Sequence, residues 1–84
     1  MFKTIKDYDN AILRVLTFVR DNNSFPEPTN ELNEIDLGDV FNLCYQRGYI
    51  DGIIVNKTAV GHYRCDGKPR ITYQGLNFIE SYNQ

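Results

Sequence analysis

Apolar residues recur near the start of the chain at the spacing of an amphipathic helix. The run from residue 6 to residue 21 places apolar side chains at intervals of three and four, on one helical face: Tyr8, Ile12, Val15, Leu16 and Val19. This spacing predicts a helix with one buried face. We expect Asp7 or Asp9 to accept hydrogen bonds from the first turn, and Asn22 or Asn23 to end the helix in the left-handed conformation.

Residues 24–36 interrupt the helical pattern. This stretch contains Pro26 and Pro28, and its only later apolar residues are Leu32 and Ile35. Proline removes a backbone donor and restricts the residue before it. The stretch therefore has room for at most one short helix, which we take as the second helix of the fold.

A second run with helical spacing follows this stretch and consists of Leu37, Val40, Phe41 and Cys44. Asp36 precedes the run and predicts an N-cap, so that the helix begins at about Leu37, with Asp39 as a carboxylate in its first turn. Gly48 is predicted to end the helix.

The next segment has the composition of β-strands. Residues 53–55 are β-branched and predict a strand, with Asp51 and Gly52 as a turn pair before it. Residues 56–59 can reverse the chain into a second strand over residues 60–65, and Asp66-Gly67 marks a second reversal. The sequence leaves open which of the two reversals forms the tip of the hairpin.

The end of the chain returns to helical spacing. After a short strand at Ile71 and Thr72, apolar residues recur at Leu76, Phe78, Ile79 and Tyr82. Thr72 is placed to cap this helix. Gly75 in its first turn lowers the helix propensity by about 1 kcal/mol relative to Ala, which indicates close backbone packing there.

The predicted order is helix, short helix, helix, two or three strands, helix. A lone hairpin is marginally stable in water, so the strands must pack on the helices and the chain folds as one domain over residues 1–84. This order predicts an α+β winged helix. The second and third helices form its helix-turn-helix core, the β-hairpin forms the wing, and a C-terminal helix follows.

Two segments resemble a known family. Residues 37–50, LGDVFNLCYQRGYI, resemble the helix and Gly-Tyr-Ile segment of YjcQ-like proteins, which are small winged-helix proteins of Gram-positive bacteria and their phages. Residues 71–79, ITYQGLNFI, are similar to the Leu-Thr-x-x-Gly signature that opens the last helix of these proteins. The departure lies in residues 24–35, where two prolines stand before the predicted turn. The resemblance implies the winged-helix fold and a tendency toward nucleic-acid contact.

Charge and hydropathy restrict where the protein acts. The chain has nine basic and eleven acidic side chains, a net charge of −2, so it is not attracted to polyanions as a whole. Its apolar runs are shorter than the roughly 18 residues that a membrane helix requires, and the N-terminus lacks the apolar segment of a signal peptide. We therefore expect a cytoplasmic protein that does not enter a membrane.

The sequence offers no signature of catalysis, and we expect no enzyme activity and no cofactor. Ser24 and Ser81 have no identifiable base partner. We expect Cys44 and Cys65 to stay reduced as structural thiols. We expect no metal site, because His62 and Cys65 on one strand would point to opposite faces and Cys44 takes a core position.

Local charge suggests nucleic-acid binding through the wing. Residues 57–70 carry four basic residues against one acid, a local charge of +3, whereas residues 27–51 carry six acids against one base, a local charge of −5. The first hypothesis is a transcription regulator that binds DNA weakly, with phosphate contacts from Lys57, Arg64, Lys68 and Arg70. Its base contacts would come from Asn42, Tyr45 and Gln46. Outward-facing Val60 and His62 would share the strand face of Arg64, with Tyr63 turned inward.

Two other interpretations stay open. The basic residues could simply keep an edge strand from pairing, and the helix face could simply be solvated. The alternative function is a protein-interaction module, a phage or mobile-element accessory factor, in which the acidic helix-turn-helix face, with Glu34, Asp36 and Asp39, binds a basic partner. Such a module could also form a homodimer through an apolar helix face.

Overall fold

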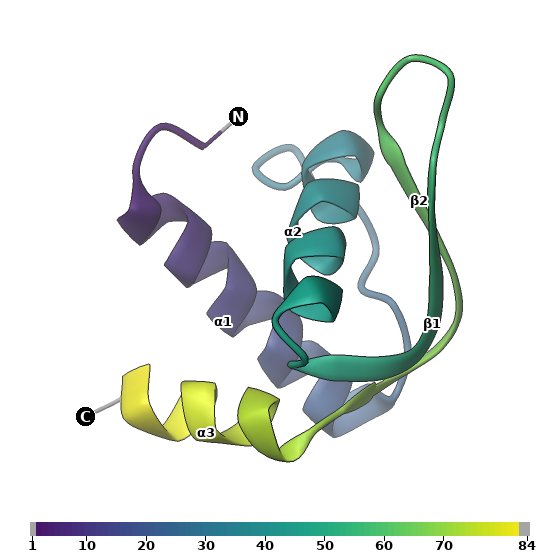
Figure 1. Cartoon of the computed structure of the whole chain (residues 1–84). Helices are drawn as coiled ribbons and strands as arrows, with labels where there is room; N and C mark the ends of the chain where they lie inside the picture. Colours follow the sequence, from purple (N-terminus) through teal and green to yellow (C-terminus); the bar gives the residue numbers. More distant parts are fainter. Residues whose placement is uncertain (1, 83–84) are drawn as a thin grey trace.

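Three helices and one β-hairpin follow one another along residues 2–82, the part of the chain that the computed structural model describes. The elements are α1 (Ile5–Asn22), α2 (Glu34–Gln46), β1 (Ile50–Lys57), β2 (Tyr63–Ile71) and α3 (Tyr73–Tyr82). In Figure 1, α2 lies between α1 and the hairpin, whose tip extends past the start of α2, and α3 crosses below. This is a small α+β domain, and its arrangement is compatible with a winged helix.

Helix α1 has the predicted buried face, but a different residue caps it. Its fully buried side chains include Ile12, Leu16 and Val19. The Thr4 hydroxyl accepts a hydrogen bond from the Asp7 N–H at 3.1 Å, so the cap precedes the two aspartates that we expected to fill this role. The predicted left-handed exit is confirmed at Asn23, where φ is 51°.

The segment between α1 and α2 contains no helix, so the prediction of a short second helix is wrong. Pro26 and Pro28 explain this result, because each lacks a backbone N–H and favours extended backbone in the residue before it. A hydrogen bond from the Thr29 N–H to the Leu32 carbonyl forms a single turn there. The predicted pairing of a second and a third helix is therefore absent, and α2 follows α1 through an extended connection.

Helix α2 begins earlier than predicted. The side-chain oxygen of Asn33 accepts a hydrogen bond from the Asp36 N–H at 2.9 Å, so Asn33 is the N-cap. Asp36 lies instead in the first turn and is 7% exposed. The predicted end is confirmed, since the helix stops at Gln46 and Gly48 has a φ of 75°.

The hairpin has two long strands, and its tip is the first of the two candidate reversals. The Thr58 N–H donates to the His62 carbonyl at 2.7 Å, so residues 58–62 form the tip. The reversal predicted at Asp66-Gly67 is wrong, because both residues lie within β2. The predicted third strand is the end of β2, and Val60 and His62 belong to the tip rather than to a strand.

A bulge replaces the turn that Asp51 and Gly52 predicted. Asp51 pairs with Arg70 and Ile53 pairs with Gly67, so two residues of β2 lie opposite the single Gly52. Gly52 and Gly67 both have positive φ, at 78° and 106°. The bulge interrupts the alternation of side chains along β1. As a result Ile50 and Ile53, three residues apart, are both buried.

The predicted capping of α3 is confirmed. The Thr72 hydroxyl accepts a hydrogen bond from the Gly75 N–H at 3.2 Å and donates to the Gly48 carbonyl. Gly75 packs closely, as predicted, because a Cβ there would collide with the Tyr49 carbonyl oxygen. The Tyr82 hydroxyl donates to the Asn10 side-chain oxygen at 2.6 Å and joins α3 to α1.

None of the helices within residues 2–82 has the length and apolar character that crossing a bilayer requires. The buried core cluster includes Val15 of α1, Val40 of α2, Ile50 of β1 and Ile79 of α3. Partly buried side chains of β2, Cys65 and Ile71, pack against it.

Candidate interaction surfaces on the hairpin and α2

Three of the four predicted wing cations lie on one face of the hairpin. Arg64, Lys68 and Arg70 occupy alternate positions of β2 that point away from the core, and all three are exposed. Lys57 pairs across the strands with Tyr63, so it belongs to the opposite face. We call the face with the three cations the outer face of the hairpin.

Carboxylates on the same strands pair with two of these cations. The Arg70 Nε lies 3.2 Å from an oxygen of Asp51, and the Arg64 Nε lies 3.6 Å from an oxygen of Asp66. Lys68 forms no ion pair with any residue in the described range 2–82. The outer face therefore has three cations and two carboxylates, a charge of +1, well below the +3 that the sequence count suggested. Asp51 was missed because only the cross-strand register brings it beside Arg70.

The three residues predicted to contact bases lie three and four positions apart at the end of α2, on one side of that helix, but they differ in exposure. Asn42 is half-buried in a hollow of about 500 Å³ between α1, α2 and β2. Tyr63 lines the same hollow, which fits the prediction that its side chain turns inward. Tyr45 and Gln46 are exposed and lie outside this hollow. Asn42 is thus the least accessible of the three predicted base-contact residues.

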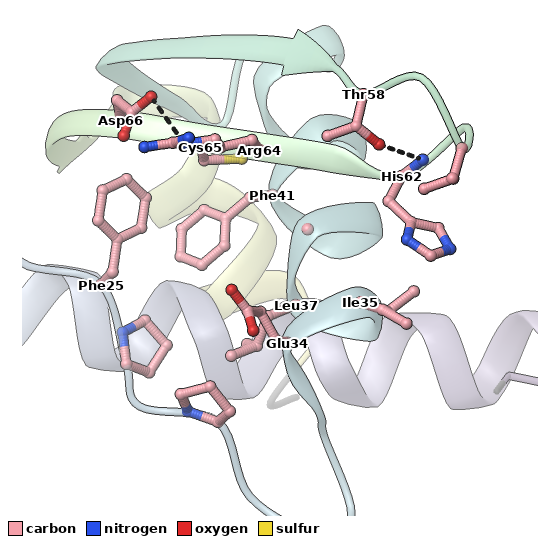
Figure 2. Close-up of a pocket in the computed structure, with 14 residues that line it drawn as sticks. Phe25, Glu34, Ile35, Leu37, Phe41, Thr58, His62, Arg64, Cys65 and Asp66 are labelled. Carbon is pink, nitrogen blue, oxygen red and sulfur yellow. Dashed lines mark hydrogen bonds and ion pairs between the residues drawn. The ribbon is translucent and has the colours of Figure 1, made fainter.

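A groove of about 630 Å³ lies beside β2. As Figure 2 shows, β2 forms one wall, α2 forms the floor and the proline-containing segment after α1 forms the other wall. Phe25 and Phe41 meet at the floor in an edge-to-face contact, with ring centroids 4.9 Å apart. We call this concavity the β2 groove.

Two aliphatic side chains extend the apolar surface of the β2 groove into solvent. Ile35 at the start of α2 is 46% exposed, and Val60 in the hairpin tip is 75% exposed. The polar side chains around them include Glu34, His62 and the Arg64–Asp66 pair. The β2 groove thus combines an apolar floor with a charged rim, as binding sites for organic groups usually do.

Sequence reasoning missed the residues that form this groove. Phe25 and Ile35 lie outside the two periodic runs, and Val60 was placed in a strand. The available signal was that Phe25 and Ile35 are large apolar residues within a polar, proline-containing stretch. An apolar residue without a place in a helical or strand pattern is a candidate for an exposed contact.

Both cysteines are free thiols with low nucleophilicity. Burial raises the pKa of Cys44 to about 12, and burial followed by the Asp66 charge raises the pKa of Cys65 to about 11. The predicted core position of Cys44 is confirmed. Within residues 2–82 no group of three or more His, Cys, Asp or Glu side chains is arranged to hold a metal ion.

Comparison of the chain with protein-family models, curated proteins and solved structures gives no match. The resemblance to YjcQ-like proteins therefore stays a prediction from the two sequence segments that carry it.

Proposed function

We propose that this chain is a non-catalytic protein-interaction module that binds a segment of another protein in the β2 groove. The observation that carries this proposal is the apolar floor, Phe25 against Phe41, continued into solvent by Ile35 and Val60. A volume of about 630 Å³ is enough to enclose several side chains of a ligand. Contiguous exposed apolar surface on a small domain favours a binding role.

The charge around the groove supports a basic partner. Glu34 at the start of α2 lies on the rim, and Glu27 lies on the connection before it, whereas Arg14 compensates the charge of Glu31 at 3.3 Å. Arg64 also lines the rim, but the Asp66 carboxylate, 3.6 Å from its Nε, compensates its charge. Complementary charge directs encounter and selects partners more than it adds affinity.

Selection from a displayed library of random peptides tests this function. The immobilised wild-type chain is the target, and the Ile35→Asp, Val60→Asp double variant is the counter-target. Both side chains are exposed, so the double variant is expected to fold. Tyr73→Asp on α3 is the matched control, because Tyr73 is 81% exposed and does not line the groove.

The expected result is a set of peptides that bind the wild type and the Tyr73→Asp variant but not the double variant. Absence of any such set refutes the function. Light scattering on the same samples shows whether a second copy of the chain occupies the groove instead of another protein. In that case the wild type would be a dimer and the double variant a monomer.

Weak nucleic-acid binding, as by a small regulator, is the second candidate. It is favoured by the shared outer face of Arg64, Lys68 and Arg70, and it ranks lower because Asp51 and Asp66 neutralise much of that charge. Fluorescence polarisation of a labelled random duplex at low and physiological salt tests it. Absence of binding at low salt refutes it, because phosphate contacts are strongest there.

A further inference from the structure

The β2 groove runs along an unpaired strand edge. In the described part of the chain the sheet has two strands, so β2 has β1 on one side and no strand on the other. Among residues 2–82, none outside β1 forms a backbone hydrogen bond with residues 63–67. Figure 2 shows β2 between β1 and the groove, and Cys65 lines the groove. The free backbone groups of this edge therefore face the groove.

The register identifies which groups are free. The His62 carbonyl accepts from Thr58, and residues of an antiparallel strand point their N–H and C=O groups alternately toward and away from the partner strand. The same alternation directs the backbone groups of Tyr63 and Cys65 away from β1. The Tyr63 carbonyl agrees with this assignment, because it lies against Gly38 of α2. The N–H and C=O groups of Cys65, which lines the groove, are then open to a ligand.

No segment between residues 2 and 82 pairs its backbone with this edge. The segment on the far wall contains Pro26 and Pro28, and proline has no N–H to donate to a strand. The aromatic ring of Phe25 holds this segment on the floor, against Phe41. The result is a fixed space between a strand edge and an apolar wall.

We infer that the occupant of the β2 groove is an extended peptide that adds to the open edge of β2 as a third strand. This inference rests on the proposed function and specifies its ligand. Alternate side chains of the peptide face the Phe25 and Phe41 floor and are apolar. A lysine or arginine between them faces the rim, where Glu34 forms no ion pair with another residue of the range 2–82.

The probe is the capped pentapeptide acetyl-Val-Lys-Val-Lys-Val-amide, titrated to millimolar concentration into the ¹⁵N-labelled chain. We expect amide shifts around Phe41 and Ile35, and hydrogen exchange at the Cys65 amide that is slower by about tenfold or more. The control probe has the same side chains but an N-methyl group on the central valine, which removes one donor. We expect this control to lose most of the protection.

Charge is tested with a second pair of reagents. The probe with glutamates in place of both lysines is expected to bind about tenfold more weakly, and Glu34→Lys is expected to reverse this preference. Glu80→Lys is the matched control, since Glu80 is exposed on α3 and does not line the groove.

Three results overturn strand addition: equal binding of the N-methylated probe, groove shifts without protection of the Cys65 amide, or no response to the lysine probe. In each of these cases groove-dependent peptides from the displayed library would leave the proposed function standing. Failure of the library selection as well would refute both.

Discussion

Gly38 controls how closely β2 approaches α2, and Gly38→Ala tests this contact. A Cβ on Gly38 would overlap the Tyr63 carbonyl oxygen, which belongs to the backbone of β2. Tyr63 is held by its pairing with Lys57, so the strand cannot move away without disturbing the hairpin. The variant must therefore separate α2 from β2 at the end of the β2 groove.

Two opposing effects set the magnitude. Replacing glycine by alanine inside a helix favours the helix by about 1 kcal/mol. Forcing an extra methyl group into a packed contact destabilises a protein by about 1–3 kcal/mol. The cost at Gly38 is expected near the upper end of this range, because the atom that the methyl group meets belongs to the backbone and cannot rotate away. The expected net loss is about 1–2 kcal/mol of unfolding free energy. For a domain of this size that loss lowers Tm by about 4–16 °C.

Thermal unfolding followed by circular dichroism measures the loss, and amide shifts of Tyr63 locate it. Gly48→Ala is the control, because a Cβ at Gly48 meets no atom within 4 Å and the only penalty is its φ of 75°. The control is expected to lose about 1 kcal/mol or more through backbone strain alone, with no shift at Tyr63. A Gly38→Ala variant more stable than the wild type would refute the reasoning, since helix propensity would then outweigh the contact.

Three further predictions concern titration, capping and charge. The folded chain holds the Cys44 proton up to a pKa of about 12, against 9.0 ordinarily, so stability should fall as the pH rises from 9 toward 12. The loss of unfolding free energy that this thiol causes at pH 10 is on the order of 1 kcal/mol. Urea unfolding measures it, and this contribution is expected to be absent in Cys44→Ala. Thr72→Ala should lower the unfolding free energy by about 1–2 kcal/mol, because it removes the α3 cap and the hydrogen bond to the Gly48 carbonyl. Thr72→Ser keeps the hydroxyl and should retain most of the wild-type stability in the same measurement. Asp66→Asn should strengthen duplex binding at low salt by freeing Arg64, and unchanged polarisation would contradict the phosphate contact assigned to that arginine.

The elements of the fold could be predicted to within a few residues wherever one physical signal dominated. The buried stripe of α1 followed from spacing alone, because a helix with one solvated face must repeat its apolar residues every three or four positions. Thr72 and Gly75 marked the start of α3 through their own chemistry. Apolar spacing and capping residues depend only on neighbours within a few positions, so they can be read directly from the sequence.

The errors arose where one sequence allows two local structures. Asp66-Gly67 is as suitable for a turn as for a bulge, and only the pairing of β2 with β1 decides between them. Asn33 and Asp36 are both suitable N-cap residues. In the structure the Asn33 side chain accepts a hydrogen bond from the Asp36 N–H, so the helix begins after Asn33. The turn at residues 29–32 forms without a helix, because the two prolines before it hold the chain extended.

The sequence by itself determined the helical faces, the caps of α3 and the concentration of positive charge after Ile50. Only the tertiary structure decided what that charge could do. Strand register placed Asp51 beside Arg70, nineteen positions later in the chain. The same register placed Lys57 on the face of the hairpin opposite Arg64. The β2 groove is likewise a product of packing, because Phe25 and Val60 meet neighbours that no local pattern specifies. Local propensity acts over a few residues, whereas a binding surface depends on which distant segments fold against each other.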